Sequence, residues 1–116
     1  GEQLQTIENA GNRMLHVDVM DGLFVPSISF GMPVIESIRP SSKMIFDVHM
    51  MVIDPERYIE DIRKSGADII SFHVEACKCI VDTLKKIKEL AHFLFIVFTD
   101  CIFNIFIAVC NKKFFR

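Results

Sequence analysis

The sequence predicts an α/β fold in which parallel strands alternate with helices. Three short apolar runs, at 14–20, 44–52 and 68–74, have the length and composition of buried strands. Between these runs, apolar residues recur every three or four positions, which is the pattern of amphipathic helices. Strands that alternate with helices form parallel sheets, because a parallel connection needs a long crossover. A chain of 116 residues is long enough for one such domain with a modest core.

The first segment, 1–11, is typical of a crossover helix. Leu4, Ile7 and Ala10 recur at helical spacing, and Gly11 is a suitable residue after a helix C-terminus. We therefore expect a short helix to lead into the first strand.

The run at 14–20 carries the residues on which the functional prediction depends. Side chains on a strand alternate between faces, so His16, Asp18 and Met20 share one face, while the other face is apolar and suited to a covering helix. A turn sequence at 21–22 ends the strand, which puts the imidazole and the carboxylate near its carboxyl end, where parallel α/β folds build their sites. A His-x-Asp pair alone is a weak signal, and a hydrogen-bonded structural pair is the alternative interpretation.

The run at 44–52 places a second histidine, His49, one β/α unit further along the chain and on the same strand face as Asp47. Taken alone, His49 would be a core histidine bonded to backbone. Adjacent parallel strands lie about 4.8 Å apart, so this strand can bring His49 within reach of an ion held by His16 and Asp18. The repeat of the pattern therefore favours a metal site.

Loops and helices complete the alternation. The loop at 22–31 is apolar enough that we expect it to pack against another part of the molecule. We expect a short helix at 33–39, ended by Pro40, and a longer helix that opens with Asp54 as its N-cap and Pro55 in its first turn. The apolar residues in the loop are Leu23, Phe24 and Val25.

The third run, 68–74, ends close to two polar residues, His73 and Glu75. Nothing in their spacing demands direct chemistry, so we assign them a supporting structural role. A further helix is expected to end near Leu90. Its apolar residues are Ile80, Leu84, Ile87 and Leu90.

Composition narrows the class of partner and the compartment. A net charge of −2 and a pI near 6.1 provide no electrostatic surface for nucleic acid and no cationic face for a membrane. The expected partner is a small molecule. The 4 cysteines follow no secretory signal, which favours reduced thiols and a cytoplasmic location. The Cys77-x-Cys79 spacing is too short for a zinc motif, so these thiols are interpreted as incidental.

Three motifs resemble the N-terminal half of the ribulose-phosphate 3-epimerase family. They are HVDVMDGLFVPSISFG, FDVHMMV and DPERYIEDIRKSGADIISFHVEA, and the resemblance runs from about residue 7 to about residue 90. It implies roughly the first half of a (β/α)8 TIM barrel, since a complete barrel takes about 250 residues. The family usually has Asn where this chain has Ser27. The resemblance also implies a sugar-phosphate substrate and a homo-oligomer for the full-length family.

The resemblance implies roles for individual residues. The metal ligands would be His16, Asp18 and His49, with Asp18 also the first acid/base carboxylate. The substrate would contact His49, Met20 and Met51. The ion would be Zn2+, Fe2+, Mn2+ or Co2+. The reaction would convert D-ribulose 5-phosphate to D-xylulose 5-phosphate at C3 by proton transfers between two carboxylates.

Parts of the family pattern are not matched by this sequence. An earlier strand with a substrate-binding serine, a late second carboxylate that is also the fourth ligand, and glycine-rich phosphate loops have no counterpart here. We expect residues 1–92 to form a partial barrel domain that is inactive alone. One alternative is a non-catalytic half-barrel that binds only metal or a partner. Another sugar-phosphate barrel enzyme is less favoured, because these strands carry no lysine array.

Residues 93–116 form a compositionally distinct apolar tail. They hold seven of the eleven phenylalanines and neither glycine nor proline. A buried strand at 93–98 is expected. Beyond it, the composition is typical of A/T-rich DNA translated out of frame or through an unspliced intron. A membrane span is disfavoured, because Asp100 and Asn104 would lie in its middle.

Overall fold

The computed structural model describes residues 1–90, 94–98 and 107–109. Within these ranges, helices and strands alternate as the sequence predicts. In chain order the elements are α1 (Glu2–Asn9), β1 (Met14–Met20), α2 (Met32–Ile38), a 3-10 turn (Arg39–Ser41), β2 (Ile45–Met51), a 3-10 turn (Pro55–Arg57), α3 (Ile59–Lys64), β3 (Ile69–His73), a 3-10 turn (Val74–Ala76), α4 (Ile80–Glu89), β4 (Leu94–Phe98) and β5 (Ile107–Val109).

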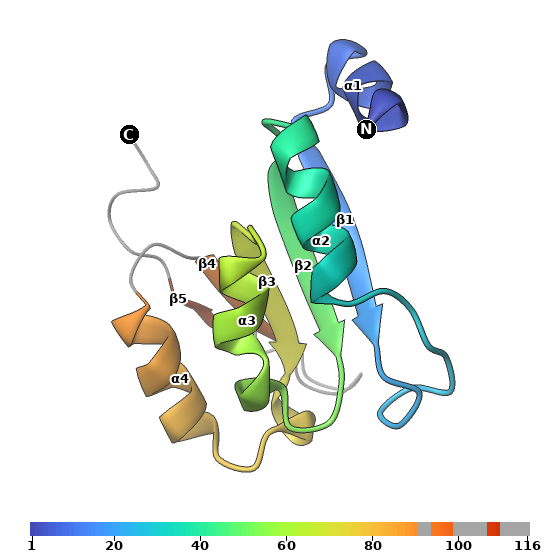
Figure 1. The fold of residues 1–116 in the computed structure, drawn as a ribbon. Coiled ribbons are helices and arrows are strands. Elements are labelled where there is room, and N and C mark those ends of the chain that lie inside the picture. The colour runs from blue at the N-terminus through green and yellow to red at the C-terminus, as the bar shows by residue number, and fades with distance from the viewer. Residues whose placement is uncertain (91–93, 99–106, 110–116) are drawn as a thin grey trace.

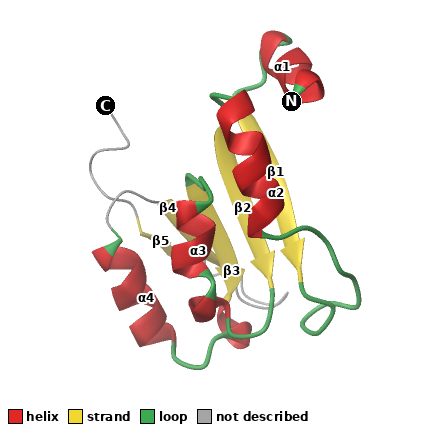
Figure 2. Cartoon of the chain, viewed as in Figure 1, coloured by secondary structure: helices red, strands yellow, loops and turns green. Residues whose placement is uncertain are grey.

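The described strands form one open sheet in the order β1-β2-β3-β4-β5. Strands β1 to β4 pair in parallel, whereas β5 pairs antiparallel with β4. Helices α2, α3 and α4 lie over one face of the sheet, and α1 lies beyond the starting ends of β1 and β2 (Figures 1 and 2). The predicted α/β fold with parallel strands is therefore confirmed. A strand was expected at 93–98, and β4 occupies the described part of that range, 94–98.

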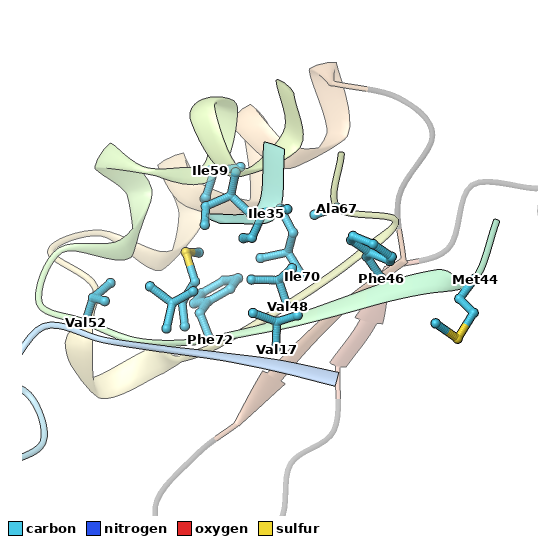
Figure 3. Packing of buried hydrophobic residues seen from close by; sticks show 13 residues of the cluster. Val17, Ile35, Met44, Phe46, Val48, Val52, Ile59, Ala67, Ile70 and Phe72 are labelled. Atoms are coloured by element: carbon cyan, nitrogen blue, oxygen red, sulfur yellow. The ribbon is translucent and has the colours of Figure 1, made fainter. Parts of the chain in front are cut away.

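The hydrophobic core lies between the sheet and its covering helices (Figure 3). Alternate residues of each strand point into it, because strand side chains alternate between faces. Phe46 and Val48 of β2 and Phe72 of β3 are fully buried against Ile35 of α2 and Ile59 of α3. Among the described residues, no helix covers the opposite face of the sheet (Figures 1 and 2). His16, His49 and His73 lie on that face.

Arg39 closes the core at the starting ends of the strands. Its guanidinium donates to the Asp68 carboxylate (3.0 Å) and to the carbonyls of Ser42 and Met44, and it lies 4.0 Å from the centre of the Phe46 ring. A cation in this position anchors the end of α2 to β2 and to the start of β3.

Two expectations about local structure are met only in part. Asp54 is the N-cap residue and Pro55 begins the turn, but the turn is 3-10 and the Asp54 side chain makes no capping hydrogen bond. The Asp54 backbone is left-handed, at φ 52°, and its carboxylate contacts Lys78 Nζ at 3.0 Å. The helix α3 consequently begins at Ile59, after a 3-10 turn. The apolar loop at 22–31 is also packed less than expected, since Leu23 is 79% exposed, whereas Phe24 does contact another residue, His73.

Within the described ranges, no helix has the length and apolar character that crossing a membrane requires. The interpretation of the tail as translated non-coding sequence concerns residues that lie mostly outside those ranges.

Candidate metal centre

The parallel pairing of β1 and β2 brings three ligand-type side chains together. Asp18 is the register partner of His49, and His16 is two residues before Asp18 on the same strand face. Partners in adjacent parallel strands lie about 4.8 Å apart and project the same way, so register alone assembles the group. One ligand atom from each of the three residues lies within 4.8 Å of the other two.

The Asp18 carboxylate lies between the two imidazoles. Its Oδ1 is 2.7 Å from His16 Nε2 and 3.7 Å from His49 Nδ1. The side chains of His16 and Asp18 are 51% and 43% exposed, whereas that of His49 is 19% exposed. Solvent therefore reaches the group from the β1 side.

A second carboxylate, Asp47, orients His16. Asp47 Oδ2 accepts a hydrogen bond from His16 Nδ1 at 2.9 Å, across the β1–β2 register. This bond is the main cause of a raised pKa for His16; burial opposes it, and the bond to Asp18 adds to it. A carboxylate on one ring nitrogen fixes the tautomer and leaves the other nitrogen for an ion. The sequence prediction gave Asp47 no role, although its place two residues before His49 was a usable signal.

His49 has the opposite electrostatic setting. Burial is the main cause of its lowered pKa, and the neighbouring His73 adds to the shift while Asp18 opposes it. A lowered pKa keeps the imidazole neutral, which is the form that binds a metal ion. His49 Nε2 lies 3.0 Å from His73 Nε2, and His73 Nδ1 lies 3.2 Å from Glu75 Oε1.

The two methionines predicted to contact substrate end their strands side by side. Met20 and Met51 are register partners, and both are partly buried on the face that carries the histidines. Strand alternation places both side chains at the carboxyl ends of β1 and β2. Phe24 lies beside the third histidine of this face, with its ring centre 5.0 Å from that of His73.

Asp21 joins the two loops that leave these strands. Its Oδ1 accepts from the backbone N–H groups of Leu23 and Phe24, and its Oδ2 accepts from that of Ile53 at 2.8 Å. Ser29 holds the loop at 22–31 against β1, because its hydroxyl accepts a hydrogen bond from the Met20 N–H. The carboxyl ends of β1 and β2 are thus fixed relative to each other.

The residues present fit a divalent cation. Two imidazoles and a carboxylate are the borderline donors that Zn2+ and its neighbours prefer. Asp47 Oδ1 is buried and without a hydrogen-bond partner within the described residues, so extra negative charge lies directly behind His16. Tetrahedral ligands about 2.1 Å from an ion are roughly 3.4 Å apart. The three ligand atoms lie within 4.8 Å of one another, so small side-chain movements would bring them to that spacing. The 2.7 Å contact between His16 Nε2 and Asp18 Oδ1 is a hydrogen bond that an ion would replace.

Comparison with known proteins assigns the chain to a family. The profile of the ribulose-phosphate 3 epimerase family matches residues 1–104. A ribulose-phosphate 3-epimerase from Synechocystis is 49% identical over 92 residues, 78% of this chain and 40% of the relative. The one from Bacillus subtilis is 44% identical over 89 residues, 77% of this chain and 41% of the relative. A chloroplastic ribulose-5-phosphate-3-epimerase from Arabidopsis thaliana is 45% identical over 92 residues, 78% of this chain and 33% of the relative.

The matched range exceeds the expected one. The resemblance was expected to end near residue 90, but the family profile reaches residue 104. The domain boundary at 92 stays a prediction. The chain spans about 40% of the length of the bacterial relatives, and its parallel strands with helices on one face are those of a partial TIM barrel. The chain belongs to the ribulose-phosphate 3-epimerase family.

Proposed function

We propose that this chain carries the metal-binding part and the first acid/base group of a ribulose-phosphate 3-epimerase. The reaction is the metal-dependent interconversion of D-ribulose 5-phosphate and D-xylulose 5-phosphate at C3. The observation that carries the proposal is the convergence of His16, Asp18 and His49 at the carboxyl ends of two parallel strands. Membership of the family supports the same reaction.

His16 Nε2, Asp18 Oδ1 and His49 Nδ1 are the atoms proposed to hold the ion. A bound divalent ion supplies positive charge that stabilises the negative charge developing on the substrate oxygens next to C3. Asp47 keeps a proton on Nδ1 of His16 and so presents the ligand nitrogen, Nε2.

Asp18 is proposed to move the proton at C3. Its Oδ1 faces both imidazoles, so Oδ2 is assigned to take the proton from one face of the substrate and to return it in the reverse reaction. Inversion also needs a carboxylate on the other face. That second group is assigned to no residue of this chain, and we propose that it belongs to the remainder of the barrel.

Met20, Met51 and one edge of His49 are proposed to contact the reacting end of the sugar. Thioethers offer an adaptable apolar surface that excludes water without competing for the proton. We propose a sugar phosphate as the small-molecule partner. A cytoplasmic location and a homo-oligomer of the full-length protein stay predictions.

The first test is metal binding by the 116-residue chain. Titration with Zn2+ in a calorimeter should show one site, and Asp18→Asn and His49→Ala should each weaken it by at least about 10-fold, since each removes a ligand. Asp61→Asn is the matched control, because Asp61 lies exposed on α3 and should leave the affinity unchanged. Equal affinity in all variants would refute the site.

The second test separates an epimerase from a half-barrel that only binds metal or a partner. We expect the isolated chain to be inactive under both hypotheses, because it covers about 40% of the bacterial relatives. Residues 1–90 should therefore replace the matching segment of the Synechocystis relative. The chimera should convert ribulose 5-phosphate in a coupled assay, and Asp18→Asn should lower its kcat by roughly 100-fold or more. A well-folded but inactive chimera would favour the non-catalytic hypothesis.

A further inference from the structure

The side chains of Glu75, His73 and His49 form a hydrogen-bonded line, which meets His49 at the ring nitrogen that does not face Asp18. Glu75 Oε1 lies 3.2 Å from His73 Nδ1, and His73 Nε2 lies 3.0 Å from His49 Nε2. The two imidazoles are stacked, with ring centres 5.1 Å apart and an interplanar angle of 25°. All three side chains are at most one-third exposed, at 32% for Glu75, 22% for His73 and 19% for His49.

The Glu75 carboxylate determines which atom donates in each of these two hydrogen bonds. An ionised carboxylate can only accept, so the proton in the first bond belongs to His73 Nδ1. A neutral His73 then has a lone pair on Nε2, which can only accept. The proton in the second bond must therefore belong to His49 Nε2. A neutral His49 that carries its proton on Nε2 has its lone pair on Nδ1, the atom that faces Asp18.

We propose that Glu75 and His73 are positioning residues that hold the proton on Nε2 of His49 and thereby present Nδ1 to the divalent ion. The inference rests on the proposed metal-binding function and adds two residues to it. Neither residue is proposed as a ligand or as a catalytic residue.

The two histidines of the centre are then oriented by the same principle through different atoms. Asp47 fixes His16 directly and leaves Nε2 for the ion. Glu75 fixes His49 through His73 and leaves Nδ1. A carboxylate behind each ligand histidine sets the tautomer and raises the basicity of the ligand nitrogen. Phe24 packs against His73 and keeps that ring in the line.

The variants separate the hydrogen bond from simple packing. His73→Phe keeps an aromatic ring beside Phe24 but removes the acceptor for His49 Nε2–H, whereas His73→Gln supplies an amide oxygen that can accept it. Glu75→Leu removes the acceptor for His73 Nδ1–H, whereas Glu75→Gln keeps one. The conservative variants should therefore rescue what the apolar ones lose.

Two readouts are needed, both on the 116-residue chain. Long-range proton–nitrogen NMR of the histidine rings should show the proton of His49 on Nε2 in the metal-free wild type, His73→Gln and Glu75→Gln. It should show a shift toward Nδ1 in His73→Phe and Glu75→Leu. Zn2+ affinity should fall by about 10- to 100-fold in the two apolar variants and stay within about 3-fold in the two conservative ones.

The outcomes distinguish this inference from the function on which it rests. If wild type binds Zn2+ and His49→Ala weakens binding, but all four variants match wild type in affinity and tautomer, the positioning role is overturned. If His73→Gln weakens binding as much as His73→Phe, His73 acts in another way and the inference also fails. If neither wild type nor any variant binds Zn2+, the proposed metal centre itself is refuted, while the tautomer measurement still tests the hydrogen-bond line. Should His73→Phe not fold, Glu75→Leu provides the same test.

Discussion

The two faces of the sheet come from the same strands but have opposite properties. On the helix-covered face, Phe46, Val48 and Phe72 are completely buried. On the other face, the side chains of His16 and Asp18 remain about half exposed, although they lie one residue from buried Val17 and Val19. A period of two along each strand therefore separates the residues that stabilise the fold from those proposed to act on a ligand.

This contrast shows where the chain can tolerate unfavourable electrostatics. The open face gathers carboxylates and imidazoles, and one oxygen of Asp47 is buried with no hydrogen-bond partner within the described residues. Such groups add little stability and can reduce it, while the covered face contributes apolar burial. Substitutions on the two faces should separate these contributions.

The largest effect is expected on the covered face. Phe72→Ala should lower the free energy of unfolding by about 3–5 kcal/mol, because it removes a fully buried ring from between the sheet and the helices. His16→Ala is the control on the open face and should change the free energy of unfolding by less than about 1 kcal/mol, since the His16 side chain is itself 51% exposed. Urea unfolding measures both. Similar losses for the two variants would break the distinction between the faces.

A smaller effect is expected at Asp21, which follows the carboxyl end of β1. Burial acts to raise the pKa of its carboxyl, but the backbone N–H groups of Ile53, Leu23 and Phe24 outweigh it, and the pKa lies below the ordinary 3.8. Asp21→Asn should cost about 1 kcal/mol at neutral pH, because an amide oxygen cannot replace both carboxylate oxygens as acceptors.

The sign of the pH dependence follows from that lowered pKa. The stability contributed by ionised Asp21 is fully present above pH 3.8 and is lost as the pH falls through the folded-state pKa. Urea midpoints measured from pH 5 to pH 2 should therefore fall more steeply for wild type than for Asp21→Asn. Parallel curves would show that the carboxylate does not hold the two loops together.

The smallest effect concerns the reactivity of two thiols in the segment between β3 and α4. Burial raises the pKa of Cys77 to about 11, whereas Cys79 is exposed. At pH 8, iodoacetamide should label Cys79 well before Cys77, because the thiolate is the reactive form. Peptide-resolved mass spectrometry gives the two rates. Equal rates would indicate that the segment after β3 opens readily.

The regular elements could be predicted from sequence because their signals are local. The alternation in 14–20 and the apolar runs at 44–52 and 68–74 correspond to β1, β2 and β3 with boundaries within about a residue. The side-chain cap at Asp54 was mispredicted for an equally physical reason. Its side chain contacts Lys78 and its N–H donates to Ala76, and such tertiary contacts override capping preference. Leu23, Ile28 and Phe30 of the loop stay exposed, whereas Phe24 packs against His73.

The candidate centre was predicted only in part. His16, Asp18 and His49 could be grouped because strand register converts sequence spacing into spatial proximity. The role of Asp47 and the line from Glu75 through His73 depend on rotamers and on which ring nitrogen faces which acceptor. Spacing alone carries no information about those choices, so the sequence could suggest only a supporting role for His73 and Glu75.

The reversed direction of β5 decides how this sheet can be extended. The antiparallel strand β5 occupies the outer edge of β4. Within the described residues, β1 is therefore the one edge of the parallel part of the sheet at which a further parallel strand could pair. A strand joining there would settle beside His16 and Asp18. Such a strand would extend the parallel sheet and at the same time shield His16 and Asp18, two of the three proposed metal ligands, from bulk water.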